Sequence, residues 1–221
     1  MAAEKFLFPI ANKLCLSVLV ILAAGAVGAS EELNEADHSA SAELITLIDA
    51  FDGVSARFLQ TVVDASLQTL EESSGRLALQ RPKFRWQVDV PFAQLIVADA
   101  AQMQIYDPDL AQVTLHDIDK RLGSTPLTIL LGDTEALAAE FAISRTKDGT
   151  KQRFVLRPRS EAALFLQVEL IFQGQLLEAL SIWDGAGQLT RIQFSETQLG
   201  RPIDAEQFEL MLPAGTDVIR G

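Results

Sequence analysis

The pattern of hydrophobic and polar positions changes from a helical period to a strand period near residue 54. Upstream of this point, apolar residues recur at i, i+3, i+4 and i+7, namely Leu44, Leu47, Ile48 and Phe51. This spacing predicts an amphipathic helix of about ten residues that begins near residue 42. The Asp52-Gly53 pair that follows is a stop signal for that helix.

Downstream, apolar and polar residues alternate in short runs, which is the pattern of half-buried β-strands. The clearest runs cover residues 54–59, 76–80, 84–89, 153–157, 164–172 and 191–195. Turn pairs separate strand segments at Asp107-Pro108, Asp148-Gly149, Gln173-Gly174 and Asp184-Gly185. Strands joined by such tight turns are antiparallel. We expect roughly ten to eleven strands in one mainly β domain, more than a strongly twisted open sheet carries without curling.

Two short helices interrupt the strand pattern. Thr125-Pro126 opens a segment in which Leu127, Leu130 and Leu131 share one helical face, and Gly132 can end the turn. A second helix is predicted to start at residue 133 or 134 and to run through residue 139. Helices this short are not stable alone in water. We therefore expect both of them to lie on the inner face of the curled sheet.

The N-terminal residues 1–29 have the layout of a secretory signal peptide. Lys5 and Lys13 precede an uncharged apolar run over residues 14–28 that ends in small residues. Cleavage is favoured after Ala29, with a second suitable site between residues 24 and 26. An uncleaved anchor is the weaker alternative, because a spanning helix needs roughly 18 to 20 apolar residues. Cys15 lies near the start of the run and not after it, which argues against a lipoprotein signal.

Residues 30–41 are polar, acidic and small, so they are predicted to form a flexible leader to a single domain over residues 42–221. The formal net charge of the chain is −12. Glu4, Lys5 and Lys13 give residues 1–29 a net charge of +1, so the remaining residues carry −13. So acidic a protein is repelled by nucleic acid and by anionic membrane surfaces. We therefore expect no nucleic-acid partner.

Residues that could support catalysis or bind a metal are scarce. His38 and His116 are the two histidines, and Cys15 is the one thiol and lies in the signal segment, so an ordinary nitrogen and sulfur metal site cannot be assembled. The sequence has no G-x-S-x-G elbow, P-loop or G-x-G-x-x-G fingerprint. His116 beside Asp117 could act as a general base, although a solvated turn histidine is the more ordinary interpretation. The prediction is a protein that is not an enzyme and needs no cofactor or metal.

The predicted strands and helices have a large apolar surface, and only a few short helices are predicted to cover it. These residues could simply form the packed core of a β domain. A single curled sheet with only three short helices over it would instead keep an incompletely filled concavity, which would suit acyl chains at about 0.8 kcal/mol per buried CH₂. We expect the cavity and its lid to include Phe58, Leu77, Leu79, Phe84, Trp86, Ile96, Met103, Ile105, Leu127, Leu130, Leu131, Leu166, Val168, Leu170, Ile192 and Phe194.

Arg81 is the charged residue that this pattern singles out. The period of two from Leu77 and Leu79 directs it toward the apolar face, just before Pro82 interrupts the strand. A guanidinium there keeps its charge and needs acceptors. The carbonyl end of the predicted 125–131 helix would supply them, which would make Arg81 a latch between sheet and lid. The alternative is an arginine at the rim that extends into water.

Several segments, in this order and spacing, resemble the LolA family of outer-membrane lipoprotein carriers of Gram-negative bacteria. They are Phe58-Leu-Gln60, Arg81-Pro-Lys-Phe-Arg-Trp86, Tyr106-Asp-Pro108 with Gln112-Val113, Thr125-Pro126 with its leucines, and Phe208-Glu-Leu-Met-Leu-Pro-Ala-Gly-Thr-Asp-Val218. The resemblance covers about residues 44–219. It departs from the family where the chain reads Asp99-Ala-Ala-Gln-Met-Gln-Ile-Tyr106, because the family usually has Asp-Gly and a tryptophan there.

The resemblance implies an unclosed antiparallel β-barrel, a half-barrel of about 11 strands with a short-helix lid. It also implies a monomeric periplasmic chaperone that receives lipidated proteins from an inner-membrane ABC transporter and delivers them to an outer-membrane receptor. A carrier or sensor of another lipid or glycolipid is the alternative function. In that family the arginine of the Arg-Pro pair holds the lid, and here this position is Arg81. Met103 or Ile105 would fill the space of the missing tryptophan.

Overall fold

The computed structural model describes residues 24–117 and 134–220. The chain divides into two units, Met1–Glu35 and Ala36–Gly221, and all of the strands belong to the second. Most of the predicted signal peptide lies outside the described residues, as does the predicted 125–131 helix with Leu127, Leu130 and Leu131. No helix in the described ranges combines the length and the apolar character that crossing a membrane requires.

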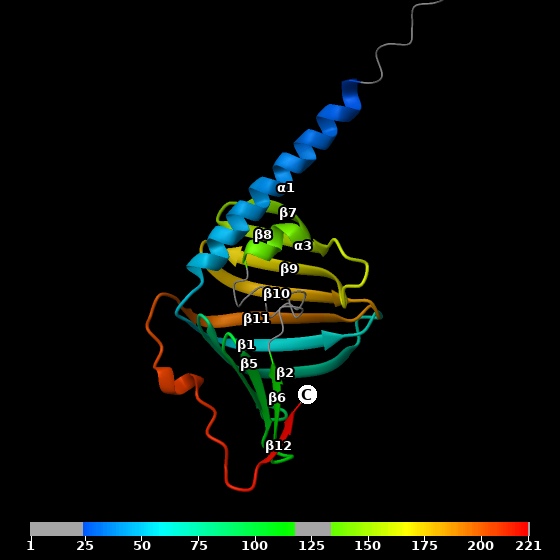
Figure 1. Ribbon diagram of the computed structural model, residues 1–221. Helices are drawn as coiled ribbons and strands as arrows, with labels where there is room; N and C mark the ends of the chain where they lie inside the picture. Colours follow the sequence, from blue (N-terminus) through cyan, green and yellow to red (C-terminus); the bar gives the residue numbers. More distant parts are fainter. Residues whose placement is uncertain (1–23, 118–133, 221) are drawn as a thin grey trace, which may run out of the picture. The chain divides into compact units, whose positions relative to one another are not determined.

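The described residues form one sheet of twelve strands (Figure 1). The strands are β1 (Val54–Val63), β2 (Thr69–Gln80), β3 (Lys83–Val90), β4 (Gln94–Ala98), β5 (Gln102–Asp107), β6 (Gln112–Asp117), β7 (Phe141–Asp148), β8 (Lys151–Pro158), β9 (Phe165–Gln173), β10 (Leu176–Asp184), β11 (Leu189–Gln198) and β12 (Asp217–Arg220). Their order is β12-β6-β5-β4-β3-β2-β1-β11-β10-β9-β8-β7.

The sheet consists of two antiparallel meanders that meet where β1 pairs with β11. The strands β7 and β12 are the two ends of the order, so the sheet is unclosed, which confirms the predicted fold class. The prediction of about 11 strands was one short, because the short β12 pairs in parallel with β6 after a long connection. The four turn pairs predicted from the sequence all lie between consecutive antiparallel strands.

Helix α1 (Ala24–Ala50) extends well upstream of the predicted start near residue 42. The prediction of a flexible leader over residues 30–41 was therefore wrong. The segment has few large apolar residues, but its Glu and Ala residues favour a helix, and Ala40 is buried in the core cluster, so the docked part of the helix begins before residue 42. Helix α3 (Thr134–Glu140) confirms the second predicted short helix, and a 3₁₀ turn, η2 (Ala205–Phe208), precedes β12.

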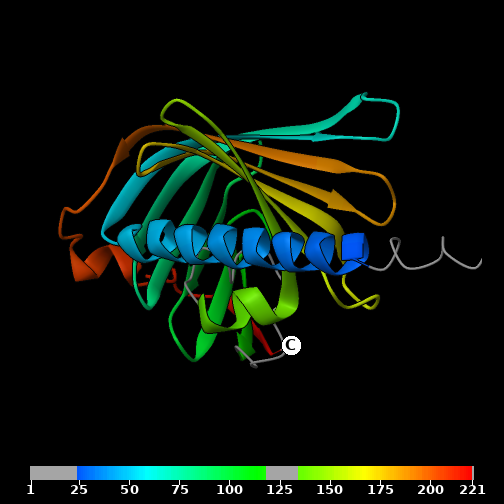
Figure 2. The same cartoon turned by 90° about the horizontal axis from the view of Figure 1, so that it is seen from above.

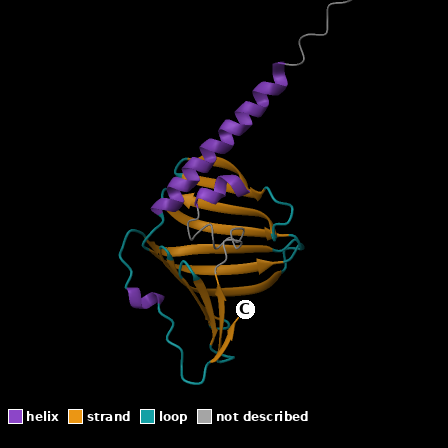
Figure 3. Cartoon of the chain, viewed as in Figure 1, coloured by secondary structure: helices purple, strands orange, loops and turns teal. Residues whose placement is uncertain are grey.

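The core lies between the concave face of the sheet and the two helices α1 and α3 (Figures 2 and 3). The four apolar residues that predicted the α1 helix are all buried there, as the helical spacing requires. They share one buried cluster with strand residues such as Phe58, Leu79 and Phe154, and Leu137 of α3 belongs to the same cluster. Burial of each large side chain stabilises the fold by about 1.5–3 kcal/mol.

Polar contacts also fasten α1 to the sheet edge formed by β7. Asp37 accepts a hydrogen bond from the backbone N–H of Ile143 at 2.7 Å, and its other oxygen pairs with Arg159 at 2.8 Å. Farther along the helix, Glu43 forms an ion pair with Arg145 of β7. Because edge strands leave backbone groups unpaired, these contacts protect one end of the open sheet.

Candidate functional site

An aromatic stack marks the concave face where β1, β2 and β3 run side by side. The ring of Phe58 lies on that of Trp86 with 3.7 Å between centroids and an interplanar angle of 18°. The β2 strand makes room for this stack with Gly75, where an added Cβ would lie 1.8 Å from the carbonyl oxygen of Gln87 and 2.9 Å from the Phe58 ring. A glycine inside a strand is typical of such close approach.

A hollow of about 340 Å³ lies beside this stack on the concave side. Trp86, Val88 and Ile96 form its apolar wall. Polar groups come from Gln60, Ser73 and Gln94 and from the carboxylates of Glu71 and Asp107. Phe92, in the turn between β3 and β4, lies at its edge and is 75% exposed. The volume is at the low end of pockets that hold small ligands. The hollow is therefore large enough for part of one flexible apolar chain.

The structure brings most of the predicted cavity residues to one apolar cluster. Phe58, Leu77, Leu79, Phe84, Val168, Leu170, Ile192 and Phe194 are buried in it, and Trp86 and Met103 pack against it. Ile96 lines the hollow, and Ile105 of β5 is the register partner of Ile96. Most of these side chains thus contact α1, α3 or one another. In the part of the chain that the structure describes, the hollow on the concave face lies at its Trp86 end.

Leu166 does not belong to this cluster, because it is 63% exposed. The apolar stripe over residues 164–172 had placed it on the same face as Val168 and Leu170. A register shift between β9 and β10 changes the phase there, since Trp183 pairs with Gln167 and Asp184 pairs with Phe165. Phe165 is buried instead, 4% exposed, and Leu166 turns outward.

Arg81 lies in the turn between β2 and β3 and binds the C-terminal end of α1. Its guanidinium donates to the carbonyl oxygen of Ile48 and, at 3.5 Å, to that of Asp49. Its backbone N–H donates to Asp52 Oδ1 at 2.9 Å. Burial lowers the pKa of the guanidinium, while the carboxylates of Asp52 and Asp49 oppose that shift.

These contacts test one part of the prediction for Arg81. A helix carbonyl end does receive the guanidinium, but that end belongs to α1, whereas the predicted 125–131 helix lies outside the described residues. The alternative of a rim arginine extended into water does not hold, because the side chain is half-buried and bonded. Cations are favourable at this end of a helix because its last carbonyls carry partial negative charge.

Sequence reasoning missed the polar residues around the hollow. Gln60 and Ser73 are register partners on β1 and β2 and share the inward phase with Phe58 and Leu77, so the period of two could have placed them. His116 had been interpreted as a turn residue, but it lies half-buried in β6 opposite Met103. That interpretation overlooked that β6 extends to Asp117.

An unclosed antiparallel sheet with an apolar concave face, helices across that face and a residual hollow defines an open half-barrel of the ligand-carrying kind. The family model described as "Outer membrane lipoprotein carrier protein LolA" matches residues 49–211 of the chain. The chain belongs to this family.

Individual relatives agree with the family match. An "Outer-membrane lipoprotein carrier protein" of Pseudomonas aeruginosa (strain UCBPP-PA14) is 38% identical over 203 residues, which cover 91% of this chain and 97% of that protein. A protein of the same description from Azotobacter vinelandii is 38% identical over 187 residues, covering 84% and 90% of the two chains. A crystal structure of an uncharacterized conserved protein from Thermus thermophilus has a TM-score of 0.52 at 12% identity. It covers 82% of this chain and 99% of that chain, and it is similar in fold alone.

Proposed function

We propose that the protein is a periplasmic carrier that binds the acyl chains of lipoproteins released from the inner membrane and delivers them to an outer-membrane receptor. The observation that carries this proposal is the hollow beside Trp86 on the apolar concave face, in a chain of the lipoprotein carrier family. An inner-membrane ABC transporter would supply the cargo and the energy. The carrier itself would act as a monomer, without catalysis or a cofactor.

The acyl site would start at the hollow and grow into the space that α1 and α3 fill. At about 340 Å³ the hollow takes part of one chain. Further chains would displace the helices from strand residues such as Leu79 and Leu170. Because each buried CH₂ contributes about 0.8 kcal/mol, a bound chain can offset the loss of several helix contacts. The cargo then replaces the protein's own cover, and release restores it.

Arg81 would act as the latch of this exchange. It bonds the end of α1 from the turn between β2 and β3, next to the strands that carry Phe84 and Trp86. The bonds to Ile48 and Asp49 hold the helix over the concave face in the unloaded protein. Movement of α1 would break them, so loading and release are both coupled to the same side chain.

The targeting of the protein follows from its N-terminus. Residues 1–29 would direct export and be removed, which would leave residues 30–221, with the carrier domain over 42–221, in the periplasm. Mass spectrometry of the protein purified from the periplasm tests the cargo class. Co-purified triacylated proteins support the proposal, whereas free lipid or glycolipid alone would contradict it in favour of a different carrier.

The decisive experiment measures whether the purified protein releases a lipoprotein from inner-membrane vesicles that contain the transporter. Ile96→Glu places a charge in the hollow, while Gln193→Glu places the same charge on an exposed position of β11 that faces away from the concave side. We expect Ile96→Glu to lose most of the release activity and Gln193→Glu to retain it. Equal losses in the two variants would contradict an acyl site at the hollow.

A further inference from the structure

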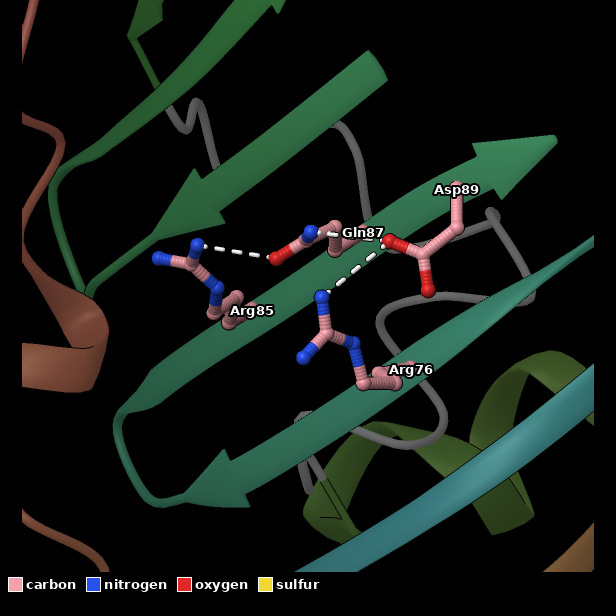
Figure 4. A network of polar contacts seen from close by, with 4 residues as sticks. All are labelled: Arg76, Arg85, Gln87 and Asp89. Atoms are coloured by element: carbon pink, nitrogen blue, oxygen red, sulfur yellow. Dashed lines mark hydrogen bonds and ion pairs between the residues drawn. The ribbon is translucent and has the colours of Figure 1, made fainter. Parts of the chain in front are cut away.

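Three arginines gather on the face of the sheet opposite to the acyl site. Arg57 of β1 and Arg76 of β2 are direct cross-strand partners, and Arg85 of β3 lies on the same face, one strand further along. Figure 4 shows Arg76, Arg85, Gln87 and Asp89 extending from one side of the β2–β3 hairpin toward one another. Like charges directly opposite on a sheet repel, so this arrangement is unfavourable without anions nearby. It is also unexpected in a chain of net charge −12.

The arginines surround a hollow of about 240 Å³. Gln198 of β11 and Gln207 of η2 complete its wall, and the backbone carbonyl of Gln207 accepts a hydrogen bond from Arg85 at 2.9 Å. The second Nη of Arg85 donates to Gln87 Oε1, also at 2.9 Å. Burial and the charge of Arg76 both lower the pKa of the Arg85 guanidinium.

The carboxylates in this cluster neutralise two of the three cations. Asp89 pairs with Arg76 at 3.2 Å, and Glu196 pairs with Arg57 at 3.4 Å. The hydrogen bonds of Arg85 in the described residues go to neutral acceptors. The five charged groups together leave a formal charge of +1 around the hollow.

A strained backbone residue shapes one wall of the hollow. Between Ser55 and Arg57 the β11 strand has one extra residue, because their partners are Gln198 and Ser195. Glu196 lies in this bulge with φ of 52°, a left-handed conformation that a residue with a side chain rarely adopts. Bulges and left-handed residues of this kind are concentrated at functional sites, where they redirect a side chain. Here the bulge places Glu196 against Arg57.

We propose that this hollow, which we call the arginine pocket (Arg57, Arg76 and Arg85), binds a phosphodiester group. A phosphodiester carries one negative charge and so balances the remaining charge of the pocket. Its two non-bridging oxygens, on a tetrahedral phosphorus, can be contacted by separate guanidiniums on adjacent strands, whereas one arginine fork already satisfies a planar carboxylate. The phosphodiester can come from a phospholipid headgroup or from a soluble phosphate ester, and the two sources share this chemistry.

The test is a titration followed by backbone amide NMR with sn-glycero-3-phosphoglycerol as the soluble probe. We expect saturable shifts at Arg76, Arg85 and Gln87 and about tenfold weaker binding in Arg85→Gln, since one charge-assisted contact is lost. Glu196→Gln removes a competing carboxylate and should strengthen binding about threefold. Arg191→Gln is the matched control, because this exposed arginine of β11 does not line the pocket, and binding should stay unchanged.

Parallel titrations identify the source and expose a failure. Co-sedimentation with phosphatidylglycerol vesicles that depends on Arg85 would assign the pocket to a lipid headgroup, and binding of the soluble probe alone would assign it to a soluble ester. Tighter binding of glutarate than of the diester, unsaturable shifts, or equal effects of Arg85→Gln and Arg191→Gln would overturn the proposal. If Arg85→Gln does not fold, the Glu196→Gln variant decides: tighter binding of the diester supports the proposal, and unchanged or weaker binding contradicts it. The concave acyl site faces the other way, so its loading is measured separately and can fail independently.

Discussion

Replacing Arg81 with leucine should loosen the C-terminal end of α1 while leaving the sheet intact. The wild-type guanidinium bonds the carbonyl oxygens of Ile48 and Asp49, the second at 3.5 Å and therefore weakly. A hydrogen bond to a charged group is worth about 1.5–3 kcal/mol. The side chain is half-buried, and its burial carries a desolvation penalty that leucine lacks, so the net loss is about 1–2 kcal/mol. This corresponds to roughly a 5- to 30-fold shift in the local opening equilibrium.

Native-state hydrogen exchange of backbone amides measures this opening directly. The amide of Phe51, which donates to the carbonyl of Ile48 at 3.0 Å, reports on the end of α1. It should exchange roughly 5- to 30-fold faster in Arg81→Leu, by the same equilibrium. The amide of Phe154, a buried residue of β8, should change much less, because local opening of α1 does not require the sheet to unfold.

Lys83→Leu is the matched control, since Lys83 is an exposed cation that begins β3 just after the same turn. It should leave the exchange of Phe51 unchanged. If Arg81→Leu and Lys83→Leu gave the same exchange rates at Phe51, Arg81 would not hold the helix, and the latch would have no physical basis. A uniform acceleration at Phe51 and Phe154 would instead show that Arg81 stabilises the whole domain.

Three further perturbations test the contacts that shape the domain. Asp37→Ala removes the acceptor of the Ile143 amide, so that amide should lose about tenfold in exchange protection, measured by NMR. Gly75→Ala forces a Cβ to 1.8 Å from a carbonyl oxygen of β3 and should lower the free energy of unfolding, measured with urea, by about 3 kcal/mol. Gly185→Ala, with open space around its Cβ, should lower it much less. Hydrogen bonds from the amides of residues 101 and 102 lower the pKa of Asp99 in the folded protein. The ionised carboxylate therefore stabilises the fold at pH values above the pKa of about 3.9 that it has in the unfolded chain. This stabilisation is lost as the pH falls through the lower pKa of the folded state. The melting temperature of Asp99→Asn should therefore lie below that of the wild type at pH 7, and the two should converge at low pH; a constant difference would contradict this assignment.

The sequence was sufficient where the determining contacts are local. Alternation along β1, β3 and β8 and the turn pairs between strands predicted the antiparallel meanders, because each strand buries one face and each tight turn joins neighbours. The apolar spacing from Leu44 to Phe51 likewise predicted the docked part of α1. These elements need no information from distant residues.

The missed features depend on residues far apart in the chain. The polar part of α1 is fastened by Asp37 to Ile143 and Arg159, more than a hundred positions away, and its own sequence does not reveal these contacts. The parallel pairing of β12 with β6 follows a long connection, so no tight turn between neighbouring strands indicates which strand β12 joins. Leu166 continues the apolar stripe in sequence, and only the register shift against β10 reveals that it turns outward.

The β2–β3 hairpin shows why register decides both proposed sites together. Leu77 pairs with Trp86 on the concave face, and Arg76 pairs with Gln87 on the opposite face, so the acyl site and the arginine pocket are built from alternate residues of the same two strands. A slip of one residue would exchange the two faces and bury the arginines. Gly75 opposes this slip, because the close approach of β3 and the Phe58 ring at this position leaves no room for a side chain. Gly75 thus favours the register that keeps the proposed acyl site on one side of the sheet and the proposed arginine pocket on the other.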